Sequence, residues 1–112
     1  MVVDARTAEW LDAVWADTLR RIERVKPEAV ICPDRIVAYR VHPGPFPAPF
    51  SDNWGKVLEA GVLDPFGTIV VAARHQSDRD LWAHEMAHCI TGIPDHPAWL
   101  FASVGPALSL AP

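Results

Sequence analysis

Residues 68–92 read TIVVAARHQSDRDLWAHEMAHCITG and join the strongest strand signal of the chain to a helix. Residues 68–73, from Thr68 to Ala73, are almost continuously apolar, which is typical of a strand covered on both faces. Ser77 and Asp80 suit the first turn of a helix, as a cap and its capping-box partner. Gly92 suits the end of that helix. The stretch therefore predicts a strand, a short turn and a helix of about three turns.

Two histidines lie four residues apart on this expected helix, in the pattern H-E-x-x-H. His84 and His88 would be about 40° apart around the helix and roughly 6 Å apart along it. Both imidazoles can then reach one metal ion at about 2.0–2.1 Å. Glu85 is rotated by about 100° from His84, so it flanks the metal and can take a proton from metal-bound water. The spacing predicts a Zn2+ site with Glu85 as the catalytic general base.

A third protein ligand is expected, because two ligands hold zinc weakly. The sequence Asp-His-Pro at 95–97 follows the helix after a short turn and can bring the chain back to the metal. His96 is favoured as the third ligand because an imidazole matches the first two; Asp95 is the alternative. His75 and Tyr39 are candidates for stabilising an oxyanion. An ordinary surface histidine and an ordinary sheet tyrosine are the competing interpretations.

The remaining elements are read from periodicity and composition. Residues 7–25 carry apolar side chains three and four apart, which predicts an amphipathic helix that packs on a sheet. Residues 29–32 and 35–41 are rich in β-branched side chains and predict one or two strands, and residues 56–60 begin a further β segment. Prolines at alternate positions in residues 43–49 favour a stiff extended loop.

Composition bounds the class of protein. The 112 residues, half of them hydrophobic, suit a single domain over 1–112 and exclude disorder. Ten basic residues against 14 acidic ones give a net charge of −4, which argues against a nucleic-acid partner. The sequence has no signal-peptide pattern and no apolar stretch of the roughly 20 residues that a membrane span needs. A cytoplasmic protein without a membrane partner is expected. Cys32 and Cys89 are interpreted as core residues.

Residues 84–88, which read HEMAH after the apolar stretch, resemble the motif of the zincin metallopeptidases. The Asp-His-Pro step at 95–97, with Phe101 four residues after the proline, is similar to that of small bacterial HExxH proteins. The resemblance implies a minimal zincin-like α+β fold, with an N-terminal backing helix, a small mixed sheet, the HExxH helix and a short C-terminal helix. The chain departs from two zincin subfamilies: it has Thr91 and Pro94 where metzincins have glycine and histidine, and no glutamate after Glu85.

The same resemblance implies a zinc peptidase, more an endopeptidase than an exopeptidase. His84, His88 and His96 would bind the zinc, and Glu85 would be the general base. Residues 68–73 would be the edge strand that pairs with an extended peptide or protein substrate. Two other functions remain open: a zincin-fold zinc-binding interaction protein without general proteolysis, and a regulatory peptidase with one partner protein as its target. The short chain, which leaves little material for a second lobe, favours the interaction protein.

Overall fold

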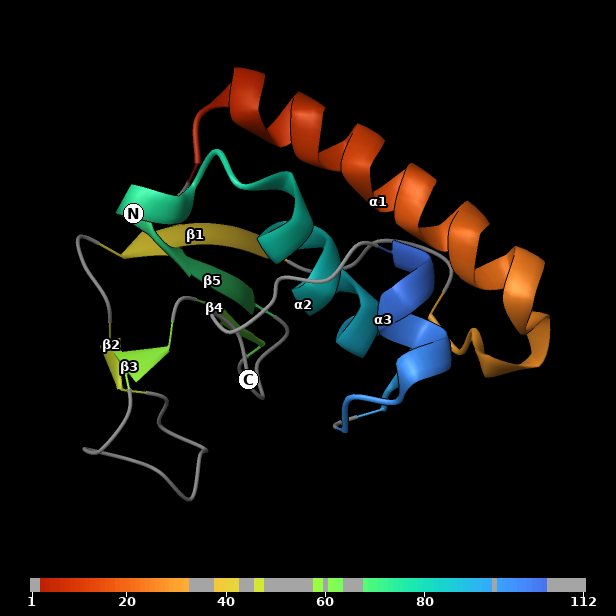
Figure 1. Ribbon diagram of the computed structural model, residues 1–112. Helices are drawn as coiled ribbons and strands as arrows, with labels where there is room; N and C mark the ends of the chain where they lie inside the picture. The colour runs from red at the N-terminus through yellow and green to blue at the C-terminus, as the bar shows by residue number, and fades with distance from the viewer. Residues whose placement is uncertain are drawn as a thin grey trace.

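The computed structural model describes residues 3–32, 38–42, 46–47, 58–59, 61–63, 68–93 and 95–104 (Figure 1). The elements in chain order are α1 (Ala5–Val25), the 3₁₀ helix η1 (Pro27–Ala29), β1 (Ala38–His42), β2 (Phe46–Pro47), β3 (Leu58–Glu59), β4 (Gly61–Leu63), β5 (Thr68–Ala72), the 3₁₀ helix η2 (Ala73–His75), α2 (Arg79–Thr91) and α3 (Ala98–Val104). The structure therefore mixes helices and strands. The expected order of an N-terminal helix, strands, the motif helix and a short C-terminal helix is confirmed.

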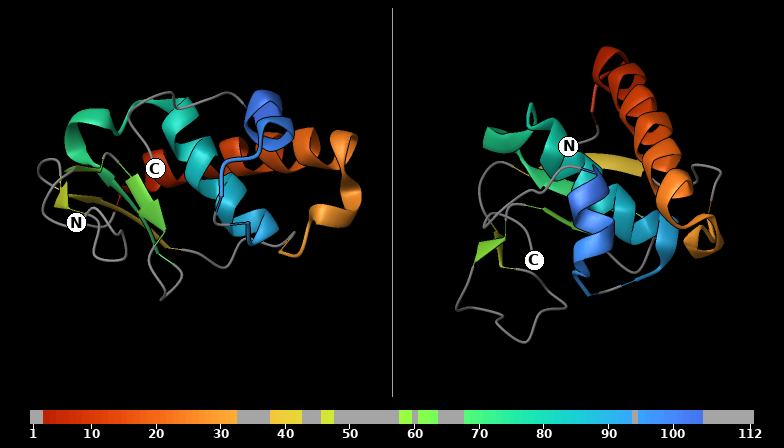
Figure 2. Two further views of the ribbon diagram at one scale, coloured as in Figure 1. Left: turned by 60° about the horizontal axis from the view of Figure 1, so that its bottom comes forward. Right: turned by 45° about the vertical axis from the view of Figure 1, so that its right-hand side comes forward.

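Helix α1 begins directly after a residue that caps its N-terminus, Asp4. The carboxylate of Asp4 accepts a hydrogen bond from Thr7 N at 2.8 Å, and this bond holds the pKa of Asp4 below its usual value. The helix buries one stripe: Leu11, Val14, Trp15, Thr18 and Ile22. This stripe packs mainly against α2 and α3, so the expectation that it covers a sheet is wrong (Figure 2). α2 lies between α1 and the sheet, so the buried face of α1 meets helices instead of strands.

The sheet has the strand order β1-β5-β4. β1 runs parallel to β5, with Tyr39 opposite Ile69, and β4 runs antiparallel to β5, with Val62 opposite Val70. The expectation that residues 68–73 form an edge strand is therefore wrong, because β5 is hydrogen-bonded on both sides. Among the described strands, β1 and β4 form the two edges of this sheet.

The segment before β1 departs from its local strand signal. Residues 29–32 form the end of η1 and a bend. The N–H groups of Ile31 and Cys32 both donate to the carbonyl of Ile90 near the end of α2, at 2.9 and 3.1 Å. The segment's hydrogen bonds thus go to a helix end, which has carbonyls without intrahelical partners. Residues 33–37, part of the expected strand, lie outside the described residues.

The proline-containing segment does contain a strand. Phe46 pairs with Glu59 and Pro47 with Leu58 in a two-stranded antiparallel ribbon, β2-β3. A proline is tolerated in a strand at an edge, where its missing N–H faces away from the partner. The expectation of a purely extended loop is wrong for these two residues.

Helix α2 is buried on nearly every side, because it contacts β4 and β5 as well as α1 and α3 (Figures 1 and 2). Residues 81–87 are all buried in succession. A helix that is covered all round belongs to the interior of a fold rather than its surface. The largest fully buried side chains of the core include Trp82, Leu11, Ile22, Ile69, Leu81 and Met86. None of the helices in the described part of the chain combines the length and apolar character that a membrane-crossing segment needs.

Candidate metal centre

Helix α2 begins and ends at residues that leave the motif inside one uninterrupted helix. The carboxylate of Asp78 accepts a hydrogen bond from Leu81 N at 3.2 Å, so Asp78 is the N-cap in place of the expected Ser77. Gly92 ends the helix in the left-handed conformation, with φ 68°, and its N–H donates to the carbonyl of His88 at 2.8 Å. The expected glycine at the helix end is confirmed.

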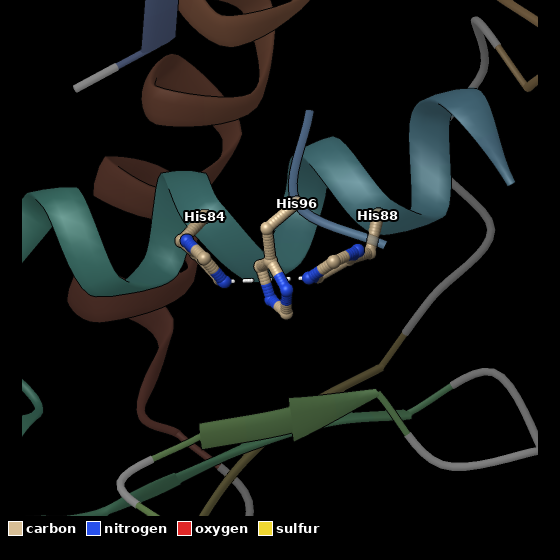
Figure 3. A group of neighbouring side chains, drawn as sticks. All are labelled: His84, His88 and His96. Carbon is tan, nitrogen blue, oxygen red and sulfur yellow. Dashed lines mark hydrogen bonds between the residues drawn. The ribbon is translucent and has the colours of Figure 1, made fainter. Parts of the chain in front are cut away.

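The structure brings three histidines together. His84 and His88 project from α2 on one side of the helix, and His96 reaches them from the segment before α3 (Figure 3). The Nε2 atoms of His84 and His88 are 3.3 Å apart. One ring nitrogen from each of the three residues lies within 4.8 Å of the others. These histidines therefore lie close enough to bind one metal ion.

The spacing fits a small tetrahedral ion. Two nitrogens bound at about 2.05 Å in tetrahedral geometry are about 3.3 Å apart. His84 and His88 already have this separation. His96 is exposed and its nitrogen lies within 4.8 Å of the other two, so a shift of about 2 Å or less completes the set. Three imidazoles without a cysteine suit zinc and neighbouring transition metals rather than calcium or magnesium.

A backbone carbonyl fixes how His88 presents its ring. The Nδ1 atom of His88 lies 2.7 Å from the carbonyl oxygen of Ile93. A carbonyl oxygen only accepts, so Nδ1 carries the proton and donates. The lone pair of the neutral ring is then on Nε2, the atom that faces His84. Metal-binding histidines commonly donate their other ring N–H in this way.

An aromatic side chain covers the histidine cluster. The ring centroid of Phe101, on α3, lies 4.3 Å from that of His84, 5.1 Å from that of His88 and 5.3 Å from that of His96. Phe101 is 7% exposed and His84 is 4% exposed. An apolar cover of this kind restricts water around a metal ion and limits the number of oxygen ligands it can collect.

Glu85 follows His84 on α2 and is almost completely buried, with 1% of its surface exposed. It does not belong to the group of three ligand nitrogens. The helical spacing predicts this arrangement, in which Glu85 lies beside the metal ligands without being one of them. The catalytic assignment of Glu85 stays a prediction.

The other candidate residues lie outside the cluster. Asp95 is exposed and is not part of the group that could hold a metal ion, although it precedes His96. Tyr39 is buried on β1 with its ring edge-on to Trp82, at 5.8 Å between centroids. His75 ends η2, and its Nε2 is buried without a hydrogen-bond partner among the described residues. The proposed oxyanion roles of His75 and Tyr39 stay predictions.

Two features of the site were missed by sequence reasoning. The carbonyl of Ile93 cannot be found from the sequence, because its direction depends on the backbone of the turn after α2. The contact of Phe101 with all three rings depends on how α3 packs against α2. The only sequence signal for Phe101 was its distance from the Asp-His-Pro step.

Neither the protein-family models, nor the curated proteins, nor the solved structures that were compared with this chain give a match. The functional interpretation of the chain therefore depends on the geometry and chemistry of the three-histidine cluster.

Proposed function

We propose that this protein is a zinc-dependent peptidase with a minimal zincin-like fold, in which His84, His88 and His96 hold the metal. The observation that carries the proposal is the convergence of the three ring nitrogens at metal-binding distance. Three protein ligands that leave a fourth position for water or substrate are characteristic of catalytic zinc sites, whereas structural sites have four. Glu85 beside the first ligand adds a proton acceptor to that set.

Each residue of the site then has a separate chemical task. When bound, zinc lowers the pKa of a coordinated water toward neutrality and polarises a carbonyl oxygen. Glu85 accepts a proton from the attacking water and delivers it to the nitrogen of the leaving amine. Its burial holds the carboxylate in one place and keeps bulk water from competing for the proton.

The substrate strand is proposed to lie along β4 rather than β5. β5 has a neighbour on both sides, whereas β4 lies at an edge of the described sheet and packs beside α2. A peptide that adds to this edge uses main-chain hydrogen bonds and stays extended past the metal site. A substrate that extends past the metal site in both directions is cleaved within its chain, and this favours an endopeptidase over the removal of terminal residues.

The test compares Glu85→Gln with the unchanged protein. The substitution keeps the shape of the side chain and removes its ability to take a proton. Both proteins are loaded with zinc, their metal content is measured, and each is incubated with a mixture of unfolded peptides. New peptide termini are then counted by mass spectrometry. Glu23→Gln, at an exposed position of α1, is the matched control.

We expect one zinc per chain in all three proteins and a loss of cleavage of about 100-fold or more in Glu85→Gln alone. Full cleavage by Glu85→Gln at full zinc content contradicts the assignment of the general base.

A zinc-binding interaction protein is the second candidate. The burial of Glu85 and His84, with 1% and 4% of their surfaces exposed, favours it because a catalytic site must admit substrate. One zinc per chain together with no cleavage of any unfolded peptide selects this alternative over the peptidase.

A further inference from the structure

Ile93, in the turn after α2, links the side chains of Thr91 and His88 through two hydrogen bonds. Ile93 N donates to Thr91 Oγ1 at 3.2 Å, and Ile93 O accepts from His88 Nδ1 at 2.7 Å. The Thr91 hydroxyl in turn donates to the carbonyl of Ala87 at 2.8 Å. Ile93 is therefore held at its N–H by Thr91 and holds His88 with its carbonyl, through two consecutive peptide units that meet at the Ile93 Cα.

The connection requires a hydroxyl group at position 91. Thr91 Oγ1 accepts one hydrogen bond and donates another, which a hydroxyl can do and an aliphatic side chain of the same shape cannot. Thr91 is 6% exposed, so water cannot readily replace it. Gly92 allows the tight return of the chain, because its φ of 68° is in the left-handed region. The backbone of residues 91–93 can thus turn its carbonyl back toward His88.

We propose that Thr91 is a positioning residue for the metal site: its hydroxyl holds the N–H of Ile93, and the carbonyl of the same residue keeps the proton of His88 on Nδ1 and leaves Nε2 available as the ligand. This inference rests on the proposed zinc site. The peptidase proposal concerns the cleavage of peptides, whereas this one concerns which ring nitrogen of His88 carries the proton before any metal binds.

The consequence for binding follows from the two tautomers of a neutral imidazole. With the proton on Nδ1, the ring offers Nε2 toward His84 at 3.3 Å. With the proton on Nε2, the ring must move that proton before Nε2 can bind a metal. Partners of this kind, which orient a ligand without touching the metal, typically contribute 10- to 100-fold to metal affinity.

Three variants separate positioning from general stability. Thr91→Val keeps the branched shape and removes both hydrogen bonds, and Thr91→Ser keeps the hydroxyl. Thr18→Val is the matched control, because the Thr18 hydroxyl makes the same bond to the carbonyl four residues earlier, Val14, at 2.7 Å, and is fully buried in α1. Any effect of losing such a bond in a buried helix appears in both valine variants.

The first measurement needs no metal and no substrate. Two-dimensional ¹H–¹⁵N NMR of the histidine rings, at a pH where they are neutral and with a chelator present, reports which nitrogen of His88 carries the proton. We expect Nδ1–H in the unchanged protein, in Thr91→Ser and in Thr18→Val. In Thr91→Val we expect a mixture of tautomers. A His88 ring with its proton on Nε2 in the unchanged protein overturns the proposal, even if Thr91→Val does not fold.

The second measurement is zinc affinity by competition with a chromophoric chelator. We expect Thr91→Val to bind zinc about 10- to 100-fold more weakly, and Thr91→Ser and Thr18→Val to stay within about threefold of the unchanged protein. A folded Thr91→Val with unchanged affinity and unchanged tautomer overturns the proposal. If no peptide is cleaved by any of these proteins, the peptidase proposal fails while the tautomer and affinity results still decide the role of Thr91.

Discussion

Replacing His96 by alanine tests the third metal ligand with little cost to the fold. His96 is exposed, whereas His84 is buried within α2. Surface substitutions usually change the free energy of unfolding by less than about 0.5 kcal/mol. Asp95→Ala is the matched control, because Asp95 is the neighbouring exposed residue and lies outside the histidine cluster. Any difference between the two variants in zinc binding is then assigned to the ligand itself.

The magnitude follows from the number of ligands. Zinc bound by four protein ligands contributes about 10–16 kcal/mol, or about 3 kcal/mol for each ligand, which corresponds to a roughly 150-fold change in affinity. At a free zinc concentration about 1,000 times the dissociation constant, the unchanged protein gains about 4 kcal/mol of stability. His96→Ala, with an affinity about 150-fold weaker, gains only about 1 kcal/mol at the same concentration.

The assay is urea unfolding of the three proteins, once with a chelator and once in a zinc buffer. The three curves with chelator should agree within about 0.5 kcal/mol. In zinc, His96→Ala should fall about 3 kcal/mol below the other two. Equal stabilisation of His96→Ala and the unchanged protein would refute the assignment of His96, and a larger loss in Asp95→Ala would make Asp95 the ligand.

Two further predictions concern the C-terminal end of α2. Gly92→Ala should lower the free energy of unfolding by about 1–2 kcal/mol, because a left-handed residue with a Cβ is strained and that Cβ would meet the Ile31 side chain at 2.6 Å. Urea unfolding without metal measures this loss of stability. An unchanged midpoint of unfolding contradicts the prediction. The pKa of the Cys89 thiol is raised to about 11, first by burial and then by its neighbour Cys32. Alkylation requires the thiolate, and a raised pKa leaves less thiolate at pH 8. A thiolate of higher pKa is also more nucleophilic, which offsets part of this loss. Cys89 should therefore be alkylated about 10-fold more slowly at pH 8 than an ordinary thiol. Mass spectrometry of the labelled protein at increasing pH checks this, and a rate that levels off below pH 9 contradicts it.

The helices could be predicted from the sequence because their signals are local. The apolar spacing in residues 7–25 predicts α1, and the glycine after the motif predicts where α2 ends. His84 and His88 meet because one turn of α2 separates them. His96 was preferred to Asp95 from ligand chemistry, and the cluster includes His96.

The pairing of strands and the packing of helices could not be predicted in the same way. Whether residues 68–73 are central or at an edge depends on which distant segments pair with them, and neither β1 nor β4 carries a signal for that. For the same reason α1 was expected to cover a sheet, whereas it packs against α2 and α3. A local pattern determines which face of an element is apolar but not what that face meets.

X-ray absorption at the zinc edge tests the central claim, that three imidazoles bind one zinc and leave a position for substrate. We predict one zinc per chain with three nitrogen neighbours and one further light atom at about 2.0–2.1 Å, and the loss of one nitrogen in His96→Ala. Sulfur at about 2.3 Å, which would bring Cys89 or Cys32 into the site, or a sixfold shell of oxygen atoms would contradict it.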